Sequence, residues 1–538
     1  MDIKILYILT FLLFVSKNVV GQHPKEQKPN IIYILADDMG LGDVSGINPE
    51  GKIKTPHIDR MIHEGMNFMD AHTSSSVCSP TRYGIMTGRY AWRTILKEGV
   101  LGGHSKPLIP KDRTTVASFL KKQGYNTVCV GKWHLGMDWT NNAPEKSKRI
   151  TAKYVTNPYQ TVNNTALDAG FDYYFGISGS LNMDPHAYME NRNLIGTLSF
   201  VKDKSEMNRR SLEDGRAGWV SEGFTRTKVL TDLAHKTSEW ITKNHQKPFF
   251  VYLPLTSPHS PIVPREEFQG KSGLNPHGDF VMETDWVVGE VLKTLDKLKI
   301  SDNTIIIFTT DNGTSPKAKI EEMKQKGHYT SWKYRGCKGT TWEGGHRVPF
   351  IVRWPQKIKP NTECHQTICT TDLLATCAEI LNKKLLGNQG EDSVSFLPAL
   401  EAKEIPNNAE RLIVHHSDKG VYAVRKGKWK LLLDNKGGSN RGKVEQITRP
   451  ITNMSDLLLF DMETDETETT NLSLQYPEIV EDLKKELAII IENGRSTKGE
   501  VQKNDPYPSA IKWHQIDLLR PYMKDKQLPF EGTYGKRL

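Results

Sequence analysis

Two pairs of oxygen-bearing side chains could together bind a cation. Asp37 and Asp38 directly follow one run of apolar, β-branched residues, and Asp311 and Asn312 directly follow another. If the two runs are neighbouring strands, three carboxylates and one amide meet at one point, and carboxylates that close would repel one another without a cation. An all-oxygen set favours Ca²⁺ or Mg²⁺ over Zn²⁺, and Ca²⁺ tolerates irregular coordination best. Either pair alone could instead be a turn that ends a strand, since Asp, Asn and Gly favour turns.

A cysteine in a helix-starting segment forms a second candidate site. Cys78 begins the segment Cys-Ser-Pro-Thr-Arg, and Pro80 shortly after it allows a helix to start there. The N–H groups and the positive dipole end of this helix would stabilise an anion or a negatively charged nucleophile at Cys78. Arg82 would lie one turn further on the same face. Alternatively, Cys78 is simply a small buried side chain.

Four apolar runs, each ending in polar residues, could position these side chains. Continuous apolar runs of this length are typical of strands covered on both faces, as in a parallel sheet between helices. The runs are 30–40, 125–136, 248–261 and 304–313. Helical patterns with a capping residue or an initial Pro begin at Thr55, Thr114, Asp285 and Thr371. The alternation predicts an α/β fold with a large, mostly parallel central sheet between helices, whose ligands bind at the carboxyl ends of the strands.

The pattern changes after about residue 400. Segments 420–434 and 456–473 are typical of hairpin strands in an antiparallel sheet, and segment 477–494 is typical of an amphipathic helix. We therefore expect a catalytic α/β domain over residues 22–400 and a smaller C-terminal α+β subdomain over residues 401–538.

The first 21 residues predict a secretory signal peptide. Lys4 precedes an apolar run of eleven residues, and small or β-branched residues follow before Gln22. Such a run is too short to span a bilayer, which takes about 20 residues, and no later apolar segment is longer. We expect an exported protein, periplasmic or secreted, with no membrane span. A buried N-terminal strand is the alternative.

The composition of the 538-residue chain excludes several classes of protein. The chain is 37% hydrophobic and 25% charged, which excludes a disordered or collagen-like protein. Its six cysteines exclude a disulfide-built scaffold, and only Cys364 and Cys369 are close enough in sequence to suggest a local pair. The net charge of +9 is diffuse, because acids interrupt the Lys-rich stretches. It therefore favours anionic substrates over a nucleic-acid partner.

The segment around Cys78 resembles the signature of the type I sulfatases, the formylglycine-dependent family of the alkaline-phosphatase superfamily. Gly88 and Arg89, further along the chain, belong to the same signature. Other motifs similar to that family follow in order along nearly the whole mature chain. They are 36–40, 131–136, 258–261, 311–313, 335–339, 343–345 and 459–472.

The resemblance implies that Cys78 itself is not the final nucleophile. In this family a dedicated formylglycine-generating or sulfatase-maturing enzyme oxidises the motif cysteine to formylglycine (3-oxoalanine). The hydrated aldehyde attacks the sulfur of a sulfate ester, and its second hydroxyl then allows sulfate to leave. The resemblance thus implies a sulfuric ester hydrolase with one Ca²⁺. The ligands of this ion would be Asp37, Asp38, Asp311, Asn312 and the modified Cys78.

The resemblance also implies roles for basic residues at the strand ends. Lys132 and Lys338 would contact the sulfate oxygens, and Arg82 would support the nucleophile. His259 would donate a proton to the leaving oxygen, and His134 would be the base for the elimination. Either histidine taken alone could be an ordinary core or loop residue.

The substrate is less well defined by the sequence. Segment 176–192 resembles the loop that many carbohydrate sulfatases place over the site, and His186 within it is a candidate substrate contact. Further candidate sugar contacts are Asn182, His328, Trp332 and Tyr334. The loop could instead serve packing alone. We expect a sulfated carbohydrate, in the first place a marine algal polysaccharide or its oligosaccharides, because of how the family is distributed.

Two alternative functions are compatible with the same motifs. Relatives with this formylglycine motif and metal site act on phosphorus, so the chain could be a phosphodiesterase or phosphonate monoester hydrolase. One cation and two lysines suit a monoanionic sulfate ester or phosphodiester better than a phosphomonoester. The other alternative is a catalytically inactive carbohydrate-binding relative, but every expected catalytic position is occupied.

Overall fold

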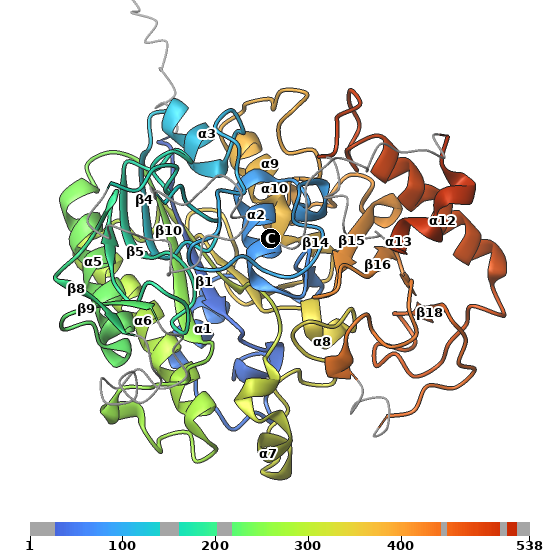
Figure 1. Ribbon diagram of the computed structural model, residues 1–538, viewed down its shortest axis with the longest axis horizontal. Helices are drawn as coiled ribbons and strands as arrows, with labels where there is room; N and C mark the ends of the chain where they lie inside the picture. Colours follow the sequence, from blue (N-terminus) through green and yellow to red (C-terminus); the bar gives the residue numbers. More distant parts are fainter. Residues whose placement is uncertain (1–26, 140–160, 202–217, 443–448, 506–513, 525–538) are drawn as a thin grey trace, which may run out of the picture.

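The computed structural model describes residues 27–139, 161–201, 218–442, 449–505 and 514–524. The expected signal peptide, residues 1–21, lies outside these ranges. No helix of the described ranges is long and apolar enough to cross a membrane. Figure 1 shows a large sheet covered by helices and, beside it, a smaller C-terminal sheet with its own helix.

A ten-stranded sheet forms the centre of the larger part. Four of its five adjacent parallel strands are the four apolar runs: β11 (Thr304–Thr310), β1 (Asn30–Asp37), β10 (Phe249–Pro258) and β4 (Asn126–Lys132). Beyond β11 lie β12 (Phe350–Arg353), β2 (Met66–Phe68) and β13 (Thr362–Cys364). Beyond β4 lie β5 (Tyr173–Ile177), β6 (Met189–Glu190) and β7 (Asn193–Leu194). The prediction of an α/β fold with a mostly parallel sheet is confirmed.

Helices cover both faces of this sheet (Figure 1). Along β1, Ile31, Tyr33 and Leu35 belong to one buried core, whereas Ile32 and Ile34 belong to another, because successive side chains of a strand point to opposite faces. The first core includes residues of α2 (Cys78–Thr87), α3 (Val116–Lys122) and α9 (Leu373–Ile380). The second includes residues of α1 (Pro56–His63), α5 (Val229–Asn244) and α6 (Pro276–Leu298). Burial on both faces explains the continuous apolar runs.

Two of the expected helices begin at other residues than the sequence predicted. Helix α6 begins at Pro276, not near Asp285, because the Asn275 side chain accepts hydrogen bonds from the first backbone N–H groups. Helix α3 is capped by Thr115, not by Thr114, through a hydrogen bond from Ser118 N. Shorter elements are β3 (Ala71–His72), α7 (Ile320–Gln325), α8 (Glu343–His346), β14 (Ile368–Cys369) and α10 (Leu397–Leu400), with the β8–β9 ribbon (Leu198–Val201, Gly218–Ser221).

The C-terminal part contains a four-stranded antiparallel sheet, as expected. Its strands, in order, are β15 (Leu412–His416), β16 (Tyr422–Lys426), β17 (Trp429–Leu432) and β18 (Leu458–Asp461). Helix α12 (Pro477–Glu492) packs on it and shares its apolar core, and α13 (His514–Asp517) follows. Segment 420–434 forms the β16–β17 hairpin, and segment 456–473 supplies β18, followed by a turn in which the Asp465 carboxylate accepts hydrogen bonds from the N–H groups of Thr469 and Thr470. The domain boundary near residue 400 stays a prediction.

Cys364 and Cys369, the one local pair that the sequence spacing allowed, do not form a disulfide. All six cysteines lie among the described residues, and each is a buried free thiol. Cys364 lies in β13 and pairs with β2, whereas Cys369 lies in β14 and pairs with β3 in a different sheet. The strand pairing therefore holds the two thiols in separate elements.

Candidate active site

The carboxyl ends of β1 and β11 bring the four expected oxygen ligands together. Because the two strands are parallel neighbours, Asp37 and Asp38 lie beside Asp311 and Asn312. One carboxylate oxygen of each aspartate lies within 4.8 Å of those of the other two. All four residues are buried. The structure thus confirms that the two pairs form one cluster.

Each of the three aspartates forms an ion pair, through one carboxylate oxygen, with a buried lysine or arginine side chain. The pairs are Lys132 Nζ with Asp37 Oδ2 at 2.6 Å, Arg82 Nη2 with Asp311 Oδ2 at 2.7 Å, and Lys338 Nζ with Asp38 Oδ1. Three other buried oxygens of the cluster have no hydrogen-bond partner: Asp37 Oδ1, Asp38 Oδ2 and Asn312 Oδ1. Burying an oxygen without a partner is costly. This all-oxygen set therefore fits a cation that prefers oxygen ligands.

The pKa values of the aspartates diverge in the same cluster. Burial, together with the neighbouring charge of Asp37, raises the pKa of Asp311 to about 7. Burial acts on Asp37 as well, but Lys132, His259 and Arg82 hold the pKa of its carboxyl well below the usual range. Asp311 would therefore be about half protonated at pH 7, and a bound cation would favour its ionised form.

Cys78 lies beside this cluster at the start of α2, as the sequence predicted. It is the first residue of the helix, and Arg82, one turn on, donates both to Asp311 and to the carbonyl of Lys132. The Cys78 Sγ atom lies 3.8 Å from Lys338 Nζ. Burial raises the pKa of the Cys78 thiol, so the thiol is protonated at neutral pH and is a poor nucleophile.

Two histidines at strand ends complete the cluster. The Nε2 atom of His259 lies 3.7 Å from Asp38 Oδ2, and burial lowers its pKa to about 4. His134 donates from Nε2 to the carbonyl of Leu101 at 2.7 Å, while its buried Nδ1 has no partner. Burial and the charge of Lys132 hold the pKa of His134 well below its usual value. His134 is therefore neutral and has a free lone pair that can accept a proton.

The candidate sugar contacts differ in their surroundings. The prediction for His328 is wrong, because it is fully buried and both ring nitrogens are engaged, with Asp43 Oδ1 at 2.9 Å and Lys52 N at 3.1 Å. Tyr334 is also buried, with the Arg347 guanidinium 4.5 Å from its ring centroid, so it offers no ring face for stacking.

The other candidate contacts stay predictions. His186 is buried, and its backbone pairs with Trp219 and Ser221 of β9. Asn182 has a side-chain oxygen without a partner, and Trp332 borders an open cleft.

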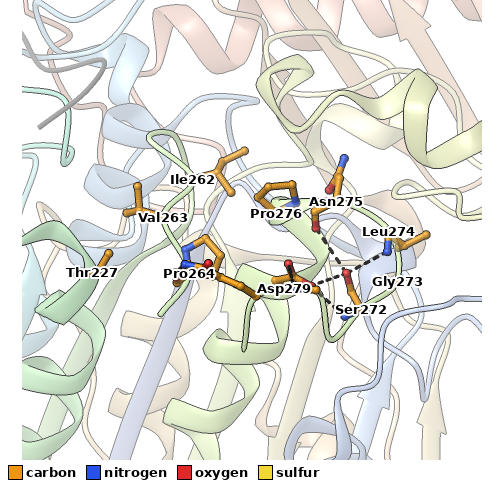
Figure 2. Close-up of a pocket in the computed structure, with 12 residues that line it drawn as sticks. Thr227, Ile262, Val263, Pro264, Ser272, Gly273, Leu274, Asn275, Pro276 and Asp279 are labelled. Atoms are coloured by element: carbon orange, nitrogen blue, oxygen red, sulfur yellow. Dashed lines mark hydrogen bonds between the residues drawn. The ribbon is translucent and has the colours of Figure 1, made fainter. Parts of the chain in front are cut away.

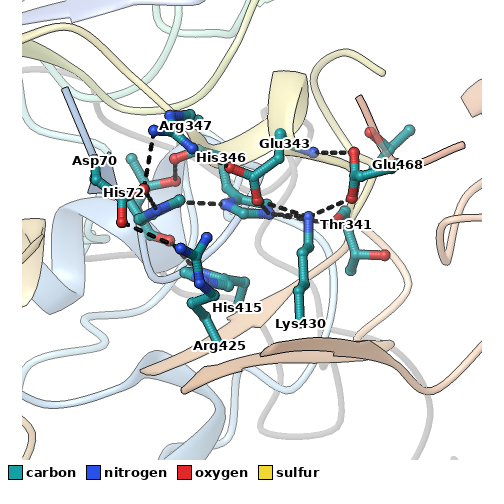
Figure 3. A network of polar contacts seen from close by, with 12 residues as sticks. Asp70, His72, Thr341, Glu343, His346, Arg347, His415, Arg425, Lys430 and Glu468 are labelled. Atoms are coloured by element: carbon teal, nitrogen blue, oxygen red, sulfur yellow. Dashed lines mark hydrogen bonds and ion pairs between the residues drawn. The ribbon is translucent and has the colours of Figure 1, made fainter. Parts of the chain in front are cut away.

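The sequence did not predict a buried polar network that the structure contains (Figure 3). It connects β3 and α8 to the C-terminal sheet, and Lys430 at its centre contacts Glu343 at 2.8 Å and Glu468 at 2.6 Å. Its other members are Asp70, His72, Thr341, His346, Arg347, His415 and Arg425. One sequence feature could have indicated this network: Lys430 lies among the apolar residues of the segment 429–432.

The family follows from comparison with known proteins. The family model named Sulfatase matches residues 29–383, which include every residue of this cluster. The chain belongs to the sulfatase family. It is 33% identical over 493 residues to an N-acetylgalactosamine-6-O-sulfatase of Bacteroides thetaiotaomicron, covering 85% of this chain and 92% of that protein. It is 30% identical to arylsulfatase A of Bos taurus over 82% of this chain and 83% of that protein.

Solved structures agree with this assignment. A sulfatase structure from work on glycosaminoglycan metabolism by Bacteroides thetaiotaomicron has a TM-score of 0.75 at 30% identity and covers 86% of this chain and 99% of that chain. A phosphonate monoester hydrolase from Silicibacter pomeroyi has a TM-score of 0.56 at 16% identity and covers 87% of this chain and 96% of that chain. At that identity it shares the fold alone. This sulfatase is thus a sulfuric ester hydrolase.

Proposed function

We propose that the sulfatase removes sulfate esters from a sulfated carbohydrate, with Cys78 converted to formylglycine and with Ca²⁺ bound by Asp37, Asp38, Asp311 and Asn312. The observation that carries this proposal is the set of three unpartnered buried oxygens beside a cysteine at a helix N-terminus. The ion would supply positive charge near the ester, and the hydrated aldehyde would supply a nucleophile that can be released again.

The basic residues would divide the remaining work. Lys132 and Lys338 are poised to contact sulfate oxygens once their aspartate partners bind the cation, and such charges act most strongly in a buried site. His259 would protonate the leaving oxygen. A sulfate beside it would raise its low pKa. His134, neutral and with a free Nδ1, would accept the proton in the release step.

A 6-sulfated N-acetylgalactosamine is the best supported substrate. The support is the bacterial relative of that name, which matches over 85% of this chain. A marine algal polysaccharide is the alternative, and its support is only the way in which the family is distributed. We also propose that the protein is exported and that a formylglycine-generating or sulfatase-maturing enzyme modifies Cys78.

Two measurements test the proposal. The first is sulfate release from 6-sulfated N-acetylgalactosamine glycans and from algal sulfated oligosaccharides, with an aryl sulfate and an aryl phosphodiester beside them. Faster turnover of the diester would contradict the sulfatase assignment. The second is the mass of the Cys78 peptide after co-expression with a maturing enzyme, which should be that of the aldehyde. Unmodified thiol as the only species in an active enzyme would contradict the formylglycine.

A further inference from the structure

An open cleft lies next to the segment that carries Lys338. Its volume is about 520 Å³, and its wall is formed by α7 and the residues that follow it. The lining residues that matter here are Asn48, Tyr329, Thr330, Trp332, Lys333 and Arg449. We call this the aromatic cleft.

The aromatic cleft adjoins the catalytic cluster along the chain. Gly336 lines the cleft, and Lys338, two residues later, contacts Asp38 and lies 3.8 Å from Cys78 Sγ. Two residues of extended chain span at most about 7 Å. On the other side, Gly42, four residues after Asp38, donates a backbone hydrogen bond to Thr330 O at 2.7 Å. One bound chain could therefore occupy both sites.

The wall of the cleft has the chemistry of a sugar-binding surface. Tyr329 is 49% exposed, and Trp332 is half-buried beside it. Aromatic side chains offer a flat apolar face with little conformational entropy to lose, and a few polar groups around them set orientation. Asn48 Oδ1 and Thr330 Oγ1 belong to the same wall and have no hydrogen-bond partner. Both oxygens are buried and do not face the open cleft, so the polar side chains that a sugar can reach are those of Lys333 and Arg449.

The backbone holds the aromatic residues in a strained turn. Trp332 has a φ of 53°, which is unusual for a bulky side chain, and its N–H donates to Tyr329 O at 2.8 Å. The turn packs directly on Gly42, where a Cβ atom would lie 2.0 Å from Tyr329 O and 2.5 Å from Trp332 N. Strain of this kind persists where the surroundings fix it, and it concentrates at binding sites.

A second hollow, of about 680 Å³, lies between residues 262–279 and Thr227 (Figure 2) and lacks these features. None of its lining residues is aromatic, and its polar side chains bind the protein itself. Asp279 accepts hydrogen bonds from Ser272 Oγ at 2.7 Å and from Gly270 N at 2.8 Å, and Asn275 caps α6. The aromatic cleft is therefore the better candidate for a sugar site.

We propose that the aromatic cleft binds the sugar units next to the sulfated unit that reacts, so that the enzyme acts on oligosaccharide chains. This proposal rests on the proposed function. Tyr329, which is 49% exposed, would stack on a pyranose ring. Lys333, whose Nζ lies 4.6 Å from the Trp332 ring centroid, would contact a sulfate of the chain. Its present partner is Glu466, and an exposed ion pair of this kind is worth little and can be exchanged.

The test compares a sulfated hexasaccharide with the sulfated monosaccharide. In Tyr329→Ala, the ratio of kcat/KM on the hexasaccharide to that on the monosaccharide should fall about tenfold. Leu386→Ala, which removes another exposed large side chain, should leave the ratio unchanged. An unchanged ratio in Tyr329→Ala would overturn the proposal.

A binding measurement keeps the two proposals separate. Calorimetry with the desulfated hexasaccharide needs no turnover, and its binding should be lost in Tyr329→Ala and retained in Leu386→Ala. Equal binding by both variants would overturn the proposal that the aromatic cleft binds sugar units. If the wild type binds this probe through Tyr329 but releases no sulfate from any sugar, the proposed function is wrong, whereas sugar binding by the aromatic cleft is supported.

Discussion

At the scale of single residues, the active site depends on groups whose protonation is set by burial. His134 is neutral, its Nε2 is fixed on Leu101 O, and its Nδ1 is free. We expect His134→Ala to lower kcat for sulfate release by about 10²- to 10⁴-fold, because a positioned base typically contributes that much. His365→Ala, which removes a highly exposed histidine, should leave kcat unchanged. Equal kcat in the two variants would remove His134 from the mechanism.

Asp311 is the residue that should respond most clearly to the cation. Ca²⁺ should raise the Tm of the wild type, since a ligand that binds only the folded state stabilises it. Asp311→Asn removes one carboxylate from the cluster and should reduce this shift strongly. Asp302→Asn, on the exposed surface, should keep the full shift. Thermal unfolding with EDTA and with added Ca²⁺ measures the effect, and an identical shift in both variants would rule out Asp311 as a ligand.

Lys97 predicts a pH dependence of stability. It is buried, and burial lowers its pKa to about 7 from 10.5. Between these pH values the unfolded chain binds more protons than the folded protein, so the free energy of unfolding should rise with pH from about 7 to 10.5. Lys97→Met should flatten that part of the profile, measured by urea unfolding at several pH values. A parallel profile in the variant would show that Lys97 does not cause the rise.

At the scale of elements, the loop after β11 depends on a close backbone contact. A Cβ atom on Gly313 would lie 1.8 Å from Gly344 O, in the segment that forms α8. Gly313→Ala should therefore destabilise the protein by about 1–3 kcal/mol and displace Asn312 from the cluster. Gly387→Ala, where the nearest atom is 3.5 Å away, is the matched control. Urea unfolding and Ca²⁺ titration measure the two effects; wild-type values for Gly313→Ala would show that the contact does not hold the loop.

At the scale of the whole molecule, buried charges join helix α8 to the C-terminal sheet. Lys430 of β17 contacts Glu343 of α8 and Glu468, and all three are fully buried (Figure 3). Lys430→Met leaves the buried Glu468 carboxylate without its cation, while Glu343 keeps Arg347 at 2.9 Å, and should cost about 3–5 kcal/mol of unfolding free energy. Lys485→Met removes an exposed pair with Asp482 and should cost less than about 1 kcal/mol. Urea unfolding measures the loss of unfolding free energy in both variants. Equal losses would contradict the expectation that the buried ion pairs contribute more than the exposed one.

The sequence by itself determined the strands of the central sheet and the polar residues at their ends. Continuous apolar runs require burial on both faces, so the strands β1, β4, β10 and β11 and the polar residues at their ends could be predicted from local pattern alone. The position of Cys78 at a helix start could be predicted for the same reason, since Pro80 and the helical spacing lie within a few residues of it.

Only the tertiary structure decided which basic side chains face which aspartates and where an open cleft lies. Lys338 and Asp38 are 300 residues apart in sequence, and Lys430 reaches Glu343 from another sheet. The same holds for His328, which local pattern suggested as a sugar contact and which Asp43 holds in the interior. Such pairings depend on how segments far apart in the sequence pack together in the fold. Local sequence patterns carry no information about that packing.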